Sequence, residues 1–290
     1  RHFPFLPIRA DQRRINPQAT GSYKMEKIGV IAGNKRFPIL FCEAAKRKNY
    51  YVVAVAIKND TSRNLKNFVD KIYWIDLNEF PRMFDIFKNE GVKQIVMAGQ
   101  INPYRLFTKE AEQSQEIKNL LRGIKDKRAD TIFGAIAERI KESGLQLMDS
   151  TILIEDLLPK KGPLTKKEPN FDQWENIYFG FDLAKSIAFL DIGQAVVVKK
   201  KAIVAVEAIE GTDNLIKRSG KIAGSGIVLV KVSKPNQDMR FDIPVVGLNT
   251  VKNLVKIRAA CLAIEAGKTL FIDKEQSIRL DDKKGIAIVA

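Results

Sequence analysis

Short apolar runs alternate with amphipathic segments between residues 27 and 100, and this alternation constrains the fold more than any other feature of the chain. The apolar runs predict strands at 28–32, 51–57, 71–75 and 94–98. Helical periodicity separates and follows them, at 36–48, 63–69, 79–89, 106–123 and 131–143. Apolar strands between amphipathic helices predict a parallel sheet covered on both faces. With a further strand at 145–148, we expect a Rossmann-like α/β domain over residues 25–157.

The second half has a different rhythm. Residues 158–170 contain three prolines and several lysines and are predicted to be an interdomain linker. After it we expect helices at 171–190 and 249–266, a hairpin of 195–198 with 202–207, and strands at 226–232, 269–272 and 285–289. These elements predict a second, mixed α/β domain over residues 171–290. It carries the most polar motifs of the chain.

Composition narrows the class of protein. The chain has 290 residues, of which 45% are hydrophobic and 29% charged, as in soluble globular proteins. The sequence contains no run of about 18 apolar residues, so no membrane-spanning helix is predicted. The net charge of +15 is spread along the chain, which indicates a lysine-rich solvated surface or attraction to an anionic substrate or membrane. Nucleic-acid binding is not expected, because no basic and aromatic reader motif is present.

Cysteine and histidine usage excludes much chemistry. Cys42 and Cys261 lie in apolar segments with helical periodicity, predict no disulfide, and fit a reducing cytoplasm as core residues. His2 is the only histidine, so no Ser-His-Asp triad and no histidine-ligated zinc is expected. It lies in residues 1–24, which we interpret as a disordered leader or non-native extension rather than a signal peptide.

Polar residues follow two strands of the predicted parallel sheet. Gly33 and Asn34 follow the first strand, and Gln100 and Asn102 follow the fourth. Carboxyl ends of parallel strands are where such sheets bind ligands, so these residues are candidates for contacts to a phosphate, sugar or base. Simple turn chemistry is the alternative. The full G-x-G-x-x-G fingerprint is missing, which weakens a dinucleotide interpretation.

A first polar island reads Glu207-Ala-Ile-Glu210-Gly-Thr212-Asp213, at the end of the predicted hairpin. Thr212 or Asp213 is a candidate helix N-cap, but a cap explains one residue and not three carboxylates within seven positions. Carboxylates crowded beside buried strands are costly unless they pair, bind metal or meet a charged ligand. We therefore expect metal binding or acid–base chemistry here.

A second polar island runs from residue 231 to 244. Its candidate ligand-binding residues are Lys231, Lys234, Gln237, Asp238, Arg240 and Asp242. Lysine and arginine suit phosphate oxygens, and two prolines stiffen the segment. A surface loop whose opposite charges pair is the alternative. Together the islands predict a metal ion with a phosphate-bearing substrate.

The ordered set of motifs resembles the LpxI family. It comprises Ile-Ala-Gly33, Met-Ala-Gly-Gln100, Glu207 to Asp213, and Lys234-Pro-Asn-Gln-Asp238-Met-Arg240-Phe-Asp242. The resemblance covers residues 26–290. It implies a Mg²⁺-dependent hydrolase that splits UDP-2,3-diacylglucosamine into 2,3-diacylglucosamine 1-phosphate and UMP in lipid A biosynthesis. It also implies two domains with the ligand between them, and a homodimer.

The resemblance places the family's catalytic aspartate on Asp213. As a hypothesis, Asp213 holds the metal or orients water, Glu210 and Asp238 support it, and the metal ligands are Asp213, Asp238 and Asp242. Lys234 and Arg240 are expected to neutralise charge on the phosphoryl oxygens. The full set expected to contact substrate is Gly33, Asn34, Gln100, Thr212, Lys231, Lys234, Gln237 and Arg240.

Two other classes of protein stay open at the level of sequence. One is an NAD-dependent oxidoreductase of nucleotide sugars, which a cofactor absorbance scan would reveal. The other is a non-catalytic nucleotide- or lipid-binding protein, which would bind without forming product. A diacylated substrate comes from a membrane surface, and a net positive protein is attracted there. We therefore expect a cytoplasmic protein in peripheral contact with the inner membrane.

Overall fold

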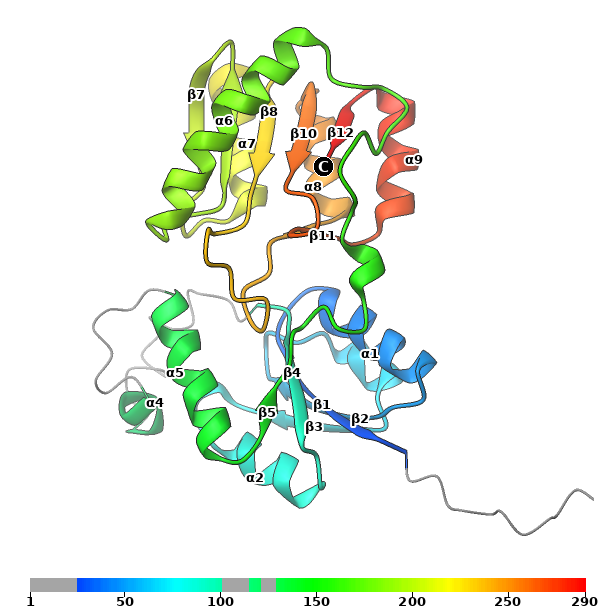
Figure 1. Ribbon diagram of the computed structural model, residues 1–290, viewed down its shortest axis with the longest axis vertical. Helices are drawn as coiled ribbons and strands as arrows, with labels where there is room; N and C mark the ends of the chain where they lie inside the picture. Colours follow the sequence, from blue (N-terminus) through cyan, green and yellow to red (C-terminus); the bar gives the residue numbers. More distant parts are fainter. Residues whose placement is uncertain (1–24, 101–114, 121–128) are drawn as a thin grey trace, which may run out of the picture.

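The computed structural model describes residues 25–100, 115–120 and 129–290. These residues form two α/β domains, which lie end to end (Figure 1). The predicted leader 1–24, Asn102 and most of the predicted helix 106–123 lie outside the described residues. Both cysteines are buried and free, as predicted. No helix of the described part is long and apolar enough to cross a membrane.

The N-terminal domain is built on a five-stranded, fully parallel sheet of order β3-β2-β1-β4-β5. Its strands are β1 (Lys27–Ala32), β2 (Tyr51–Ile57), β3 (Lys71–Ile75), β4 (Gln94–Ala98) and β5 (Gln146–Leu147). Its helices are α1 (Phe37–Arg47), α2 (Arg82–Asn89), α4 (Gln115–Leu120) and α5 (Ala129–Glu142), with 3₁₀ turns Arg63–Phe68, Leu77–Glu79 and Glu155–Leu157. One apolar core lies under α1 and another under α2 and α5. The Rossmann-like prediction is confirmed.

The C-terminal domain contains a second five-stranded sheet, of order β12-β10-β8-β6-β7. Its strands are β6 (Ala195–Lys199), β7 (Ala202–Val206), β8 (Val228–Lys231), β10 (Cys261–Ile264) and β12 (Ala287–Val289). Strand β6 is antiparallel to both β7 and β8, while β8, β10 and β12 are parallel. A two-stranded sheet pairs β9 (Val245–Val246) with β11 (Leu270–Phe271).

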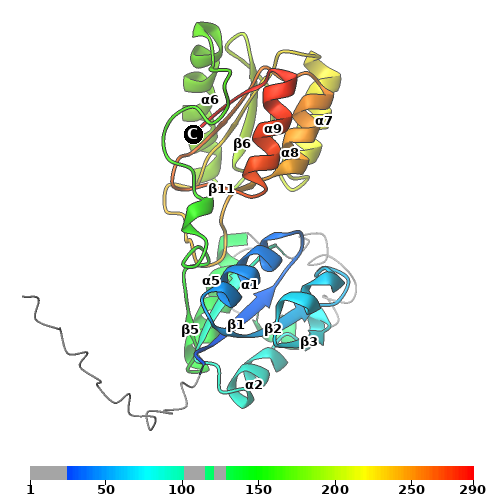
Figure 2. The same ribbon diagram turned by 90° about the vertical axis from the view of Figure 1, so that its right-hand side faces the viewer.

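Helices cover both faces of this second sheet. α6 (Phe171–Phe189) lies on one face, and α7 (Thr212–Ala223), α8 (Leu248–Lys256) and α9 (Lys274–Lys284) lie on the other (Figure 2). Each face has its own apolar core. Residues of the predicted linker pair with the sheet, since Leu164 N donates to Ile288 O at 2.8 Å. The prediction of a mixed α/β second domain is confirmed.

The predicted helix 249–266 is wrong in its second half. α8 ends at Lys256, and Arg258 then adopts a positive φ of 51° that a helix cannot continue through. Cys261, predicted in a helical segment, begins the fully buried strand β10 between β8 and β12. A short apolar run buried on both faces has no periodicity that separates strand from helix.

The two domains meet at the carboxyl edges of their sheets. In Figure 1 the arrowheads of β8 and β10 point toward the N-terminal domain, and in Figure 2 that of β1 points toward the C-terminal domain. Ser150 Oγ lies 2.6 Å from the carbonyl oxygens of both Met97 and Arg240. Arg36 pairs with Asp273 at 2.9 Å. Contacts of this kind hold the segment after β8 against the end of β4.

One buried carboxyl group in α9 has no partner. Asp281 is 1% exposed, and neither of its oxygens has a hydrogen-bond partner among the described residues. Burial, together with the neighbouring charge of Asp282, raises the pKa of Asp281 from 3.8 to about 7. The native state therefore keeps this proton at pH values where the unfolded chain has released it.

We expect Asp281→Asn to stabilise the protein at pH 8. Between pH 4 and 7 the native state binds more protons than the unfolded state. The free energy of unfolding of the wild type therefore falls as the pH rises from 4 to 7, and this group causes no further change above pH 7. The gain should reach at most about 4 kcal/mol at pH 8 and shrink toward pH 4. Thermal unfolding at several pH values measures it, with exposed Glu275→Gln on the same helix as control. A gain independent of pH would contradict this account.

Candidate active site at the carboxyl edge of the second sheet

The carboxyl edge of the second sheet gathers charged and polar residues from several strands. Strands β7, β8 and β10 run in the same direction, so the residues that end or follow them meet at one edge. These residues are Glu207 after β7, Lys231 at the end of β8 and Glu265 after β10. β6 starts at the same edge, which brings in Asp191 and Gln194. We name Asp191, Glu207, Thr212, Lys231, Lys234 and Asp242 the edge network.

Thr212 links a buried carboxylate to a buried ammonium. Its hydroxyl donates to Glu207 Oε1 at 2.6 Å and accepts from Lys231 Nζ at 2.7 Å. Glu207 and Lys231 are each only 8% exposed. Lys231 forms no direct ion pair with a described residue, so its positive charge is compensated only through the hydroxyl. A buried charge held this way favours an anionic ligand.

Lys234 is the centre of a second group. Its Nζ lies 2.6 Å from Asp191 Oδ1 and 2.8 Å from Asp242 Oδ2, with all three side chains largely buried. Gln194 Nε2 donates to Asp242 Oδ2 at 3.4 Å, and its Oε1 is buried with no hydrogen-bond partner among described residues. Gln237 accepts from Lys234 N at 2.9 Å and donates to the Asp242 carbonyl. The structure thus brings the predicted residues Lys234, Gln237 and Asp242 together.

A third ion pair anchors the start of the segment that follows β8. Lys185 Nζ lies 2.8 Å from Glu265 Oε2, which also accepts from Ser233 N at 2.8 Å and Ser233 Oγ at 2.9 Å. Burial raises the pKa of Glu265, but these donors outweigh it and the pKa is lowered overall. The carboxylate therefore stays ionised and fixes Ser233 between β8 and β10.

Asp213 lies where two helices begin. It is in the first turn of α7, and its carboxylate accepts from Asn249 Nδ2 at 2.6 Å and Asn253 Nδ2 at 3.1 Å, both on α8. Helix N-termini favour negative charge and offer unpaired backbone amides to anions. Thr212, its neighbour in sequence, belongs to the edge network. Asp213 is thus a fixed, partly exposed carboxylate next to the buried charges.

Three other predicted residues have local partners. Glu210 pairs with Arg218 at 2.7 Å on the outside of α7; burial raises its pKa, but Arg218 outweighs burial and the pKa is lowered. Asp238 and Arg240 pair with each other at 2.6 Å, which lowers the pKa of Asp238 and raises that of Arg240. Each of these charges is paired with an opposite charge at most eight residues away along the chain. The alternative of opposite charges pairing in a surface loop applies to Asp238 and Arg240.

Gly33, Asn34 and Gln100 come together at the facing edge of the first sheet. Asn34 N donates to Gln100 O at 2.8 Å, and Gly33 N donates to Ala98 O at 2.8 Å. A Cβ atom on Gly33 would lie 2.7 Å from the backbone of Gly99, so only glycine allows this close approach. Asn34 Oδ1 is buried without a hydrogen-bond partner among described residues, a polar atom left over for a ligand.

The expected metal ligands are not gathered into one site. Asp213 contacts α8, Asp238 contacts Arg240, and Asp242 contacts Lys234. Among the described residues no group of three or more carboxylate, histidine or cysteine side chains is placed to hold a metal ion. Asp238 and Asp242 each pair with a cation of their own segment instead. Asp213 has hydrogen-bonded support from two asparagine amides on α8, of the kind that metal-binding carboxylates have.

Several site residues were not among the sequence-based candidates. Asp191, Gln194, Lys185 and Glu265 lie in segments that were assigned to a helix end, a turn or a helix interior. A signal for Glu265 existed, since it is the first charged residue after an apolar run. A short apolar run does not distinguish strand from helix, so the sequence alone does not place Glu265 at the end of a strand.

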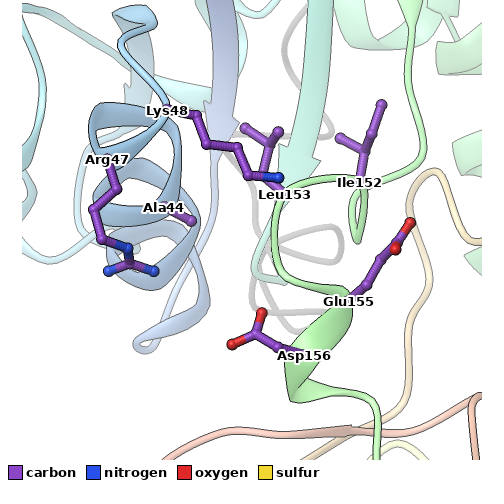
Figure 3. Close-up of a pocket in the computed structure, with 7 residues that line it drawn as sticks. All are labelled: Ala44, Arg47, Lys48, Ile152, Leu153, Glu155 and Asp156. Carbon is purple, nitrogen blue, oxygen red and sulfur yellow. The ribbon is translucent and has the colours of Figure 1, made fainter. Parts of the chain in front are cut away.

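One pocket of about 350 Å³ lies away from the edge network (Figure 3). It is lined by Ala44, Arg47 and Lys48 at the end of α1 and by Ile152, Leu153, Glu155 and Asp156 of the chain leaving the first domain. Its cations and anions face each other across the opening (Figure 3). None of its lining residues belongs to the edge network, so it is not part of the candidate site.

Comparison with known proteins identifies the family. Residues 27–157 match the LpxI N-terminal domain, and residues 160–289 match the LpxI C-terminal domain. The chain belongs to the LpxI family. This LpxI chain is 27% identical over 278 residues, 91% of its length, to the UDP-2,3-diacylglucosamine pyrophosphatase LpxI of Caulobacter vibrioides, of which 97% is covered. The resemblance inferred from sequence is confirmed.

Solved structures give only distant likenesses to this LpxI chain. The biotin carboxylase domain of Hydrogenobacter thermophilus 2-oxoglutarate carboxylase is 13% identical at a TM-score of 0.26, covering 69% of this chain and 42% of that one. Thermotoga maritima N5-carboxyaminoimidazole ribonucleotide synthetase is 18% identical at a TM-score of 0.23, covering 64% and 43%. Similarities this low carry no argument about function.

Proposed function

We propose that this protein hydrolyses the pyrophosphate bond of UDP-2,3-diacylglucosamine, giving 2,3-diacylglucosamine 1-phosphate and UMP in lipid A biosynthesis. The observation that carries the proposal is the site at the carboxyl edge of the second sheet, in a chain of the LpxI family. Buried Lys231 and the carboxylate of Asp213 lie there next to the N-terminus of α7. The relative from Caulobacter vibrioides carries the name of this activity.

The chemistry needs a positive environment for the diphosphate and a carboxylate for water. Water attacks one phosphorus, the bond from that phosphorus to the bridging oxygen breaks, and the bridging oxygen leaves with the electron pair on the second phosphate. Asp213 orients the water and accepts its proton. Lys231 and the amides at the start of α7 stabilise negative charge on the phosphoryl oxygens. Lys234 positions the segment 234–242 rather than meeting the phosphates, since two carboxylates already surround it.

Mg²⁺ belongs to the proposal as cofactor. Magnesium often binds one or two carboxylates together with substrate phosphates, so Asp213 is the residue that would hold it. The ion supplies charge neutralisation to the diphosphate when bound. The asparagine amides on Asp213 hold its carboxylate in one orientation, which is the support such a ligand needs.

The facing edge of the first sheet is the proposed site for the uridine part. Gly33, Asn34 and Gln100 present close backbone and an unpartnered amide oxygen there. Carboxyl edges of such sheets are where nucleotides bind. A homodimer and peripheral contact of the basic protein with the cytoplasmic face of an anionic inner membrane complete the proposal.

The decisive experiment measures UMP release. Purified protein is incubated with UDP-2,3-diacylglucosamine in detergent, with Mg²⁺ or with a chelator. UMP and the lipid phosphate in equal amounts, formed only with Mg²⁺, are expected. Binding of the substrate, seen as a thermal shift, without any UMP would favour a non-catalytic binding protein. Turnover that persists in chelator would contradict the Mg²⁺ requirement alone.

A further inference from the structure

Two turns at the carboxyl edge of the second sheet leave apolar side chains exposed. Phe189, the last residue of α6, is 70% exposed, and Leu190 and Ile192 in the α6–β6 turn are 58% and 48% exposed. Ile209 in the β7–α7 turn is 52% exposed. These four are among ten exposed large apolar side chains in the described part of the chain. Single exposed apolar residues are ordinary, but a group next to a polar site indicates binding.

Contacts of the backbone join the two turns into one surface. Gln194 N donates to Glu207 Oε2 at 3.3 Å, and Glu207 N donates to Ala195 O at 2.8 Å. A Cβ atom on Gly193 would collide with the carbonyl oxygen of Glu207, so glycine is required for this approach. Ile192 and Ile209 flank this contact in sequence, one on each turn. The four exposed side chains therefore lie on adjoining turns, and we define Phe189, Leu190, Ile192 and Ile209 as the apolar rim.

The apolar rim borders the edge network directly. Asp191, between Leu190 and Ile192, pairs with Lys234 at 2.6 Å. Glu207, two residues before Ile209, accepts from Thr212 at 2.6 Å. The lower end of α6 in Figure 1 lies on the side of the domain where the arrowhead of β8 points. A charged site with an apolar border suits an amphiphile that has a charged head and apolar tails.

We propose that the apolar rim receives the fatty acyl chains of the substrate and holds them beside the polar site. This inference rests on the proposed function and names the surface that recognises the lipid part. The occupant is the acyl chains of the bound substrate molecule, because the rim is continuous with the residues that would surround its phosphates. Two other exposed aromatic residues of α6, Phe171 and Tyr178, lie in the N-terminal half of the helix and serve as a control.

The test compares two double variants on two substrates. Phe189→Ser with Leu190→Ser changes the apolar rim, and Phe171→Ser with Tyr178→Ser changes equally exposed residues elsewhere on α6. Each is assayed with long-chain UDP-2,3-diacylglucosamine in detergent and with an analogue that carries acetyl groups. The rim variant should raise KM for the long-chain substrate about tenfold or more, since apolar area is no longer buried. Turnover of the acetyl analogue should stay at the wild-type level, and the control should change neither.

Other outcomes overturn the inference. Equal losses on both substrates would show that the turns act through the edge network. No change on the long-chain substrate would show that the acyl chains lie elsewhere. A loss confined to substrate in anionic vesicles, absent in detergent, would assign the rim to a bilayer contact. If wild-type protein releases no UMP from either substrate, the proposed function falls. A weaker thermal shift of the rim variant with diacylglucosamine 1-phosphate then still supports the acyl surface, and an equal shift overturns it.

Discussion

Asp213→Asn is expected to lower the turnover of UDP-2,3-diacylglucosamine by about 10²–10⁴-fold while the protein stays folded. Asparagine has nearly the same shape as aspartate and keeps an acceptor for Asn249 Nδ2, which donates at 2.6 Å in the wild type. It cannot accept a proton from water, and it carries no charge for a metal ion. The loss should therefore appear in turnover and leave the thermal midpoint nearly unchanged.

A matched control exists at the start of another helix. Asp172 occupies the first turn of α6, as Asp213 does in α7, but it lies at the opposite end of its domain and is exposed. Asp172→Asn should leave UMP release at the wild-type level, because it removes the same charge without touching the site. Near-normal turnover of Asp213→Asn, with an intact fold, would show that another group activates the water.

Lys234→Ala is expected to destabilise the protein by about 3–5 kcal/mol, since it leaves two buried carboxylates without their cation. In the wild type the ammonium lies 2.6 Å from Asp191 and 2.8 Å from Asp242, and the lysine is 8% exposed. Urea unfolding followed by circular dichroism measures the change in the free energy of unfolding.

An exposed ion pair supplies the comparison for Lys234. Arg82 pairs with Glu79 at 3.0 Å, but its side chain is 60% exposed, so Arg82→Ala should cost less than about 1 kcal/mol. Combining Lys234→Ala with Asp191→Asn and Asp242→Asn should recover part of the lost stability, because the unpaired charges are gone. A cost for Lys234→Ala as small as that for Arg82→Ala would mean that water screens the buried group.

The first sheet could be read from sequence because local pattern and global fold agree there. Each strand of the N-terminal domain is a short apolar run with a helix of clear periodicity behind it, and β1 to β4 lie within a residue of the predicted bounds. The hairpin of β6 and β7 was also visible, since Lys200 and Lys201 interrupt its two apolar runs. The spacing of apolar residues and the residue types in a turn depend only on residues near one another in sequence. Both can therefore be recognised from the sequence alone.

The site depended on contacts that the sequence does not express. Thr212 and Lys231 are candidates from the sequence, but the bridge that Thr212 makes between Glu207 and Lys231 depends on β7 and β8 running in the same direction. Lys185 and Glu265 are 80 residues apart, and they become partners because α6 packs on β6 and β8, next to the strand that Glu265 follows. The three aspartates expected to share a metal have separate partners in the structure.

Sequence by itself predicted strands β1 to β4, the hairpin of β6 and β7, the helices α1, α2 and α5 beside the first sheet, and the polar residue types available for phosphate chemistry. Tertiary structure alone decided which charges neutralise each other and which stay available to a ligand. The physical reason is that the free energy of a buried charge depends on its nearest opposite charge in space. For Lys234 the nearest opposite charge is that of Asp191, which lies 43 residues earlier in the chain (234 − 191). No local sequence pattern predicts this pair.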